Sequence, residues 1–184
     1  NKMINASKNM DTISLGSWCF WCIEAVFSEL KGDESVVAGY AGGFVKNPSY
    51  KDVCSGTTGH AEVAQITYNP SLISLGDILE VFWKTHDPTT LNRQGADVGT
   101  QYRSSIFYHN DKQGDEAKSY KEQLLASKAW DNPIVTEILP ISNYSAAENY
   151  HQDYYSQNTG DQYCKFVIQP KLDKFRKVFA SKLK

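Results

Sequence analysis

Residues 12–30 read TISLGSWCFWCIEAVFSEL, and this stretch decides the fold because its apolar period changes within a few residues. From Thr12 to Leu15 polar and apolar side chains alternate, as they do in a half-buried strand. Beyond the junction, apolar side chains recur at helical spacing, at Ile23, Val26, Phe27 and Leu30. The pattern predicts a strand that leads directly into a helix, with Cys19 and Cys22 at the junction.

The next hundred residues continue this alternation of strands and helices. Further strands are predicted at residues 35–38, 62–68 and 102–108. Before the last of them, Ser74 and Asp77 form a capping-box-like start to a second helix. The order β-α-β-β-α-β is that of the ferredoxin-like α/β plait, so we predict an α+β fold with a mixed sheet. Two long loops, 39–59 and 87–100, are expected to carry the active site, because such loops in compact domains are usually functional.

The C-terminal third extends this core. Its pattern predicts a surface helix at 111–128, a strand at 134–139, a helix opened by a Ser145/Glu148 capping box, and a last helix marked by Leu172, Phe175 and Phe179. Because there is no internal repeat or low-complexity linker, we expect residues 11–184 to form one domain after a flexible segment, 1–10. Residues 156–184 are expected to form a C-terminal tail and helix, and the basic residues of 171–184 a solvated face.

Composition excludes several classes of function. The 184 residues include 19 Lys and Arg against 21 Asp and Glu, and the basic residues are mostly scattered, which argues against a nucleic acid partner. No apolar run approaches the roughly 20 residues that span a bilayer. Four cysteines are too few for a disulfide scaffold, so we expect a reducing, cytoplasmic compartment. Residue 1 is not Met, so the possibility of a removed export signal stays open.

The two cysteines at the junction allow three interpretations. A thiol in the first turn of a helix lies at the positive end of the macrodipole, which predicts a lowered pKa and a reactive Cys19. The Cys-x-x-Cys pair could be a redox dithiol, half of a zinc site with Cys54 and His60, or a reactive Cys19 beside a buried Cys22. A second closely spaced ligand pair is missing, which disfavours zinc, and free cysteine is among the most buried residue types. We therefore favour a packed Cys22.

Several polar and aromatic side chains are candidates for a pocket around Cys19. Phe20 and Trp21 follow it directly and form either core or the wall of a site for an apolar substrate group. Glu62, where a loop enters a strand, is either solvated or lines that pocket. In the second case burial would raise its pKa and let it donate a proton near neutrality. Tyr50 and Tyr102, on or beside the two loops, have phenols that could supply hydrogen bonds.

Longer motifs follow one another along most of the chain. They are CFWCIE at 19–24, GYAGG at 39–43, NPSY at 47–50, SGTTGHAE at 55–62, QGADVGTQYRS at 94–104 and ENYHQDY at 148–154. In this order they closely resemble the peptide methionine sulfoxide reductase A family, and the resemblance covers residues 13–163. It implies an elaborated ferredoxin-like plait that reduces the S epimer of methionine sulfoxide, free or in proteins, without a metal or an organic cofactor.

The resemblance also implies a role for each matching residue. Cys19 would attack the sulfoxide sulfur, and Glu62 would protonate the sulfoxide oxygen, because this oxygen leaves poorly unless protonated. Tyr50 and Tyr102 would assist Glu62 with hydrogen bonds. The remaining members of the pocket would be Phe20 and Trp21, holding the ε-methyl group, and Asp97, supporting the pocket through polar contacts.

The step after attack depends on a second thiol. The sulfenic acid formed on Cys19 must be closed to a disulfide before it is overoxidised. The resemblance favours Cys164 as the resolving thiol, with Cys22 as the alternative and Cys54 as a bystander. Thioredoxin would then reduce the disulfide, acting on a monomeric enzyme. A Cys19/Cys22 oxidoreductase that acts on protein disulfides is the alternative function.

One position departs from the family. Trp18 stands directly before the nucleophile, where the family usually has glycine. Glycine there would allow a left-handed backbone or a close approach of two chain segments, which tryptophan does not readily permit. We expect Trp18 to narrow the sulfoxide pocket or to change how a peptide substrate docks.

Overall fold

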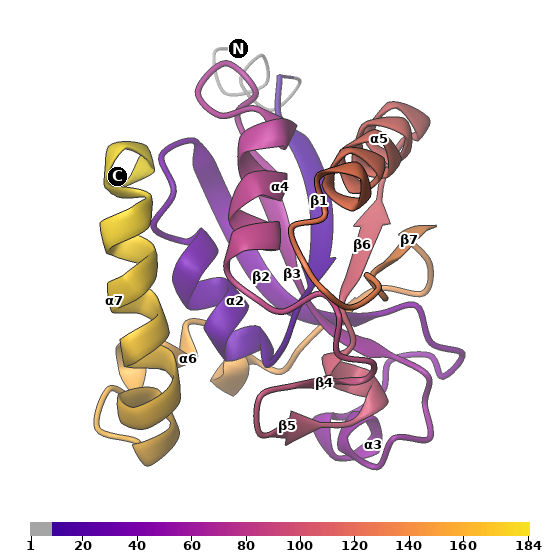
Figure 1. The fold of residues 1–184 in the computed structure, drawn as a ribbon. Coiled ribbons are helices and arrows are strands. Elements are labelled where there is room, and N and C mark those ends of the chain that lie inside the picture. The colour runs from indigo at the N-terminus through magenta and orange to yellow at the C-terminus, as the bar shows by residue number, and fades with distance from the viewer. Residues whose placement is uncertain (1–8) are drawn as a thin grey trace.

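A six-stranded sheet with helices packed on one face forms the centre of the computed structural model, which describes residues 9–184 (Figure 1). Its strands are β1 (Asp11–Gly16), β2 (Asp33–Ala41), β3 (Ala61–Tyr68), β6 (Ser105–Tyr108), β7 (Glu137–Pro140) and β8 (Ser145–Ala146), while β4 (Arg93–Gln94) and β5 (Asp97–Val98) form a separate hairpin. The helices are α2 (Phe20–Phe27), α3 (Tyr50–Cys54), α4 (Leu75–Lys84), α5 (Asp111–Ser127), α6 (Tyr154–Gln157) and α7 (Gln169–Val178). None of the helices within residues 9–184 is long and apolar enough to cross a membrane.

The strand order confirms the predicted fold. Across the sheet it is β7-β6-β1-β3-β2-β8, and the four central strands pair antiparallel with one another. This is the order of a ferredoxin-like plait, in which α2 and α4 connect the strands across the same face. β7 pairs in parallel with β6, and β8 extends the other edge, so the sheet is mixed. Residues 1–8, most of the segment expected to be flexible, lie outside the described residues.

Strand alternation sets the two faces of the sheet. Ile13 of β1 and Ile66 of β3 are register partners, and both belong to the large core under the helices. Val63 lies on the opposite face, in a smaller cluster with Phe107. Because successive side chains point to opposite faces, Glu62 has the same orientation as Ala64 and Ile66, toward the helices.

Some predicted elements have other boundaries or do not form. β2 continues through Gly39 to Ala41, and β6 begins at Ser105 because residues 100–102 form a 3₁₀ turn instead. The predicted helix at Ser145 is wrong, since β8 occupies its start. Glu148 does not cap a helix, because its carboxylate accepts hydrogen bonds from Tyr40 and from the backbone of residue 50.

The C-terminal segment is docked along its length. Cys164 to Ile168 form one π-helical stretch that continues into α7, whose Leu172 and Phe175 are buried in the main core. Near the end, Leu183 bridges to Leu30, so the chain is held against the end of α2. Segment 164–184 is therefore part of the packed structure, with its cysteine already inside.

Candidate active site

The junction between β1 and α2 places Cys19 at the N-cap of the helix. Gly16 ends β1 where the backbone must pass close to its neighbours, because a Cβ there would lie 2.6 Å from the Ser105 hydroxyl oxygen and 3.0 Å from the Glu62 carbonyl oxygen. Cys19 then adopts an extended backbone, and its carbonyl accepts from the amides of Cys22 and Ile23. Its side chain is only 6% exposed.

The predicted low pKa of Cys19 is wrong for this arrangement. Burial raises the pKa of the thiol well above its usual range, and the neighbouring Cys22 and Glu62 raise it further. The backbone N–H of Trp21 favours the thiolate, as expected at a helix start, but this effect is smaller. The loss of hydration thus raises the pKa of Cys19 more than the helix terminus lowers it, and Cys19 is a protonated thiol before substrate binds.

Glu62 lies beside this helix start with one oxygen engaged and one free. Its Oε1 accepts from the Phe20 backbone N–H at 3.1 Å, which satisfies an amide in the first turn of α2. Oε2 is buried and has no hydrogen-bond partner within residues 9–184. Burial raises the pKa of Glu62 to about 8, so the carboxyl is protonated at neutral pH. Because Oε1 is an acceptor, the proton belongs on Oε2.

Tyr50 and Tyr102 approach Glu62 from the two long loops. Tyr50 begins α3, which is fixed by a reciprocal capping box between Ser49 and Asp52. Tyr102 ends the 3₁₀ turn that follows the β4–β5 hairpin. Burial raises the pKa of both phenols, and the next largest cause in each case is the charge of Glu62. Both phenols therefore stay protonated donors in the electrostatic field of that carboxyl.

Phe20 and Trp21 form one side of an aromatic cluster. Phe20 is completely buried, and its ring is stacked 6.2 Å from that of Tyr50. Trp21 stacks on Tyr154 with ring centroids 3.8 Å apart, and its indole N–H donates to Nδ1 of His151 at 3.0 Å. Phe20 is buried in the cluster that also contains Cys19, and the half-buried Trp21 packs against this cluster, so both rings lie beside the thiol.

The C-terminal segment covers the other side of the thiols. The Tyr163 hydroxyl donates to Asp97 at 2.5 Å and lies 3.6 Å from the sulfur of Cys22. Cys164 is buried in the same cluster as Cys19 and Cys22, and burial raises the pKa of its thiol, with smaller contributions from the charges of Asp161 and Cys22. Cys19, Cys22 and Cys164 therefore lie in one buried cluster.

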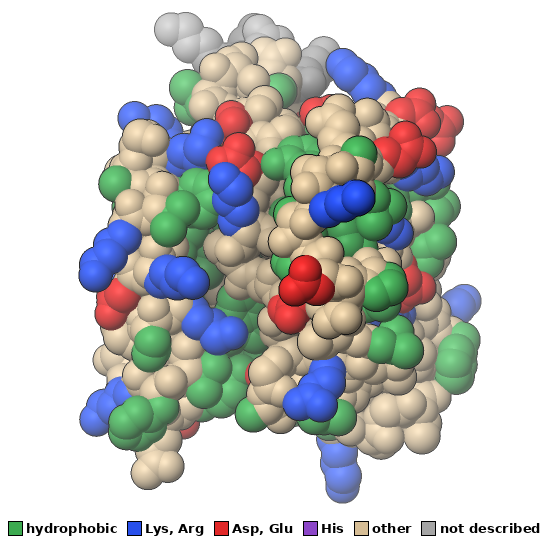
Figure 2. All heavy atoms as spheres, viewed as in Figure 1, with side chains coloured by type: hydrophobic (Ala, Val, Ile, Leu, Met, Phe, Trp, Pro, Cys, Tyr) green, Lys and Arg blue, Asp and Glu red, His purple; other side chains and the backbone are tan. Residues whose placement is uncertain are grey.

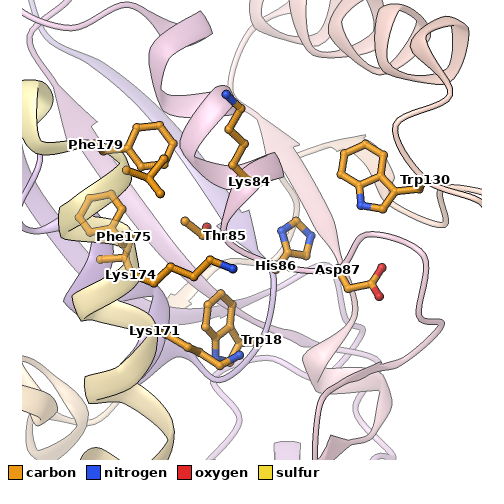
Figure 3. Close-up of a pocket in the computed structure, with 12 residues that line it drawn as sticks. Trp18, Lys84, Thr85, His86, Asp87, Trp130, Lys171, Lys174, Phe175 and Phe179 are labelled. Atoms are coloured by element: carbon orange, nitrogen blue, oxygen red, sulfur yellow. The ribbon is translucent and has the colours of Figure 1, made fainter.

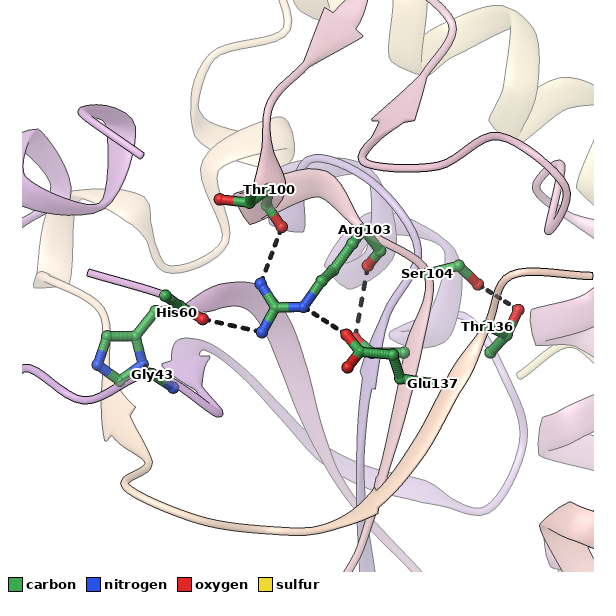
Figure 4. A network of polar contacts seen from close by, with 9 residues as sticks. Gly43, His60, Thr100, Arg103, Ser104, Thr136 and Glu137 are labelled. Atoms are coloured by element: carbon green, nitrogen blue, oxygen red, sulfur yellow. Dashed lines mark hydrogen bonds and ion pairs between the residues drawn. The ribbon is translucent and has the colours of Figure 1, made fainter. Parts of the chain in front are cut away.

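Arg103 ties the two long loops to the edge of the sheet (Figure 4). Its guanidinium donates to the carbonyls of Gly59 and Thr100, one from each loop, and pairs with Glu137 of β7 at 2.6 Å. His60 fixes the first loop from within, since Nδ1 accepts from the Gly43 amide. These contacts place the loops on which Tyr50, Glu62 and Tyr102 depend.

Sequence reasoning assigned no role to several residues of this cluster. They are Glu148, His151, Tyr154 and Tyr163. The first three lie in the ENYHQDY motif, and that motif was their only signal.

Within residues 9–184 no three His, Cys, Asp or Glu side chains gather as a metal would require. Cys54 is exposed, and His60 is already engaged with the backbone of the loop.

The side chain of Trp18 has an orientation that the sequence did not predict. Its backbone is not left-handed, so tryptophan is accommodated there without the strain that glycine would relieve. Its ring lies under the ammonium of Lys171, 4.1 Å from the ring centroid, and lines a cavity beside α7. The indole therefore faces α7 rather than the loops that carry Tyr50 and Tyr102.

Comparisons with known proteins agree with this geometry. A family model described as peptide methionine sulfoxide reductase matches residues 11–183. The chain is 52% identical over 173 residues to the peptide methionine sulfoxide reductase MsrA of Haloquadratum walsbyi, covering 94% of this chain and 98% of that one. Among solved structures it is similar to reduced Mxr1 from Saccharomyces cerevisiae, with a TM-score of 0.78, 39% identity and coverage of 85% of this chain and 90% of that one. It is also similar to Mxr1 in complex with Trx2, with a TM-score of 0.55, 29% identity and coverage of 80% and 86%. The chain belongs to the peptide methionine sulfoxide reductase family.

Proposed function

We propose that this enzyme reduces methionine-(S)-sulfoxide, free or within proteins, to methionine. One observation carries the proposal: a buried carboxyl with a pKa of about 8 holds an unpartnered oxygen beside the buried thiol of Cys19. A sulfoxide offers an electrophilic sulfur to the thiol and a basic oxygen to the acid. Phe20 and Trp21 supply apolar walls for the methyl group, and Asp97 supplies polar support.

The raised pKa values of both groups suit a coupled proton transfer. Glu62 gives its proton to the sulfoxide oxygen and, as a carboxylate, takes the proton of the Cys19 thiol. The Cys19 sulfur forms a bond to the substrate sulfur, and the oxygen then passes to Cys19 as methionine leaves. Tyr50 and Tyr102 donate hydrogen bonds to the oxygen as its charge changes. The products are methionine and a Cys19 sulfenic acid.

We propose that the sulfenic acid is resolved first by Cys22 and that Cys164 is the recycling thiol. Cys22 follows Cys19 by three residues at the helix start and raises its pKa, whereas Cys164 lies in the same buried cluster. Attack of Cys22 on the sulfenic sulfur releases water and forms the Cys19–Cys22 disulfide. Thiol exchange then moves the disulfide to Cys22–Cys164, leaving Cys19 reduced.

The reductant proposed for this last disulfide is thioredoxin. The similar yeast Mxr1 has been solved in complex with Trx2, and a dithiol such as dithiothreitol would substitute. The proposed chemistry needs no metal or organic cofactor, since every electron comes from thiols. We further propose a monomer in the cytoplasm, where four reduced cysteines are maintained.

The deciding experiment measures methionine release from each sulfoxide epimer with dithiothreitol. We expect turnover of the S epimer only, and no turnover by Cys19→Ser. Turnover of the R epimer alone, or rapid reduction of protein disulfides without sulfoxide reduction, would contradict the proposal.

The order of the thiols is tested separately by single turnover followed by thioredoxin-coupled turnover. Cys164→Ser should release one equivalent of methionine, accumulate the Cys19–Cys22 disulfide and recycle slowly. Cys22→Ser should release one equivalent and accumulate sulfenic acid. Full thioredoxin-coupled activity in Cys164→Ser would remove Cys164 from the sequence, and unchanged activity in Cys22→Ser would make Cys164 the direct resolving thiol. Cys54→Ser, on the exposed end of α3, is the matched control.

A further inference from the structure

The cavity that Trp18 lines is outside the candidate active site, between α7 and the end of α4. Its volume is about 360 Å³, toward the lower end of the roughly 300–1,000 Å³ typical of small-molecule sites. Figure 2 shows Lys and Arg side chains along α7 beside a hollow in which apolar atoms are visible. The cavity contains two features that the proposed reaction does not use: Trp18 and the basic face of α7.

The interior of the cavity is mainly aromatic (Figure 3). Trp18 lines one side of the cavity. Phe175 of α7 and Phe179, directly after α7, line a second side, and Trp130 lines a third. His86 contributes an uncharged wall, because burial lowers its pKa to about 4 and both ring nitrogens are hydrogen-bonded, to the Phe82 carbonyl and the Ser104 hydroxyl. These surfaces would hold the apolar body of a ligand.

Its rim is cationic. Lys84, Lys171 and Lys174 line the cavity, with Asp87 as the acidic member. Lys84 pairs with Glu80 at 3.5 Å, and Thr89 donates two hydrogen bonds to the Asp87 carboxylate.

The remaining cations of the rim are Lys171, whose ammonium group lies over the Trp18 ring, and Lys174. Neither forms an ion pair with any residue from 9 to 184, and Figure 3 shows Lys174 extended from α7 toward the cavity. The Trp18 indole N–H is likewise buried and has no hydrogen-bond partner in the described chain. An unpartnered buried donor next to unpaired ammonium groups indicates an anionic acceptor.

We infer that this cavity binds a small amphiphilic monoanion, a carboxylate attached to an apolar chain or ring. The carboxylate lies between Lys171 and Lys174, and the apolar body packs against Trp18 and Phe175. The site is independent of sulfoxide chemistry, although it shares the β1–α2 junction, since Trp18 precedes Cys19 directly. A bound ligand bridges that junction to α7, which continues from the segment of Cys164.

Calorimetric titration of the reduced enzyme tests the inference with octanoate for a chain and phenylacetate for a ring. We expect at least one of the two to bind with one-to-one stoichiometry, and the better binder identifies the shape of the apolar body. Octanamide and phenylacetamide, which keep the shape without the charge, should bind about tenfold more weakly or worse. Octylammonium should not bind. Equal affinity of the amide and the acid, or no binding of either acid at 10 mM, would overturn the inference.

Variants locate the site. Lys171→Gln combined with Lys174→Gln should weaken the carboxylate about tenfold or more, while leaving the amide unchanged. Lys177→Gln is the matched control, because Lys177 is also exposed on α7 but does not line the cavity. Unaltered carboxylate binding by the double variant, or an equal loss in Lys177→Gln, would contradict the assignment. Thermal unfolding without ligand shows whether each variant is folded, and none of these measurements depends on reductase activity.

Discussion

At the scale of single residues, burial decides the chemistry of both reacting groups. The helix start favours a charged Cys19, but a nearly inaccessible thiol loses more from dehydration than it gains from the helix terminus. The same burial keeps Glu62 protonated, with Oε1 held by Phe20 and Oε2 free. A thiol and an acid that are both neutral can exchange protons with a sulfoxide without creating an isolated buried charge.

Glu62→Gln should lower kcat by about 10²- to 10⁴-fold. The glutamine amide still accepts a hydrogen bond from the Phe20 backbone N–H, but it cannot transfer a proton to the sulfoxide oxygen. Wild-type turnover should fall as the pH rises through about 8, since Glu62 then ionises before substrate binds. Glu24→Gln is the control. Glu24 is also buried and has a raised pKa of about 7, but its carboxyl group accepts a hydrogen bond from the Asp153 backbone N–H. A wild-type profile that is flat from pH 7 to 9 would remove Glu62 as the acid.

Asp33 predicts a pH dependence of stability that is separate from catalysis. Burial raises its pKa to about 8, and both carboxylate oxygens lack hydrogen-bond partners within residues 9–184. Because the folded-state pKa lies above the unfolded one, its contribution is fully present below about pH 4 and is lost as the pH rises through about 8. Asp33→Asn should therefore gain stability over wild type as the pH is raised from 4 to 9.

Urea unfolding across that pH range measures the effect. Glu34→Gln, one residue further along and exposed, is the matched control and should follow the wild-type curve. If the difference between Asp33→Asn and wild type does not grow with pH, Asp33 is charged in the folded protein.

At the scale of elements, the two active-site loops depend on Arg103. Lysine cannot replace it, since one ammonium group does not present the planar fork that reaches Gly59, Thr100 and Glu137 together. Arg103→Lys should reduce stability by about 1–3 kcal/mol, because acceptors at a partly buried site lose their donor. It should also lower kcat, since Tyr102 directly precedes Arg103 in the chain.

Urea unfolding and steady-state kinetics check this prediction together. The control is Arg93→Lys, because Arg93 is exposed on the neighbouring hairpin and its guanidinium makes one hydrogen bond within residues 9–184, to the Gly95 carbonyl. Equal effects of the two substitutions would mean that Arg103 does not hold the loops.

Elements were predictable where local pattern and packing coincide. The period of two in β1 and the helical period of α2 and α4 match the buried faces, so their order was sufficient to predict the plait. Ser145 and Glu148 carry the spacing of a capping box, yet Glu148 is engaged by Tyr40 and the Tyr50 amide. Those partners lie about a hundred residues away, and a local pattern holds no information about them. Tyr163 was missed for the same reason, as one of eleven tyrosines.

At the scale of the whole molecule, the C-terminal segment closes the site that it is proposed to serve. The Tyr163 hydroxyl bridges Asp97, on the β4–β5 hairpin, and Cys22, on α2, so the two sides of the site are joined across the thiols. With this bridge in place Cys19 is only 6% exposed and Glu62 1% exposed. We therefore expect a peptide substrate to bind only after Tyr163 has moved, and this movement should also shift the adjacent Cys164.

Tyr163→Phe tests this closure, because it removes the hydroxyl and keeps the ring. Loss of one hydrogen bond of about 0.5–1.5 kcal/mol should raise the open fraction, and with it the rate of Cys19 alkylation by iodoacetamide, by about two- to tenfold. Tyr155→Phe is the matched control, since the Tyr155 hydroxyl, on α6, donates to Gln169 of α7 rather than to Asp97. If alkylation of Cys19 is equally slow in both variants, the bridge does not limit access. A faster rate in Tyr163→Phe alone would make opening of the C-terminal segment the step that precedes substrate binding.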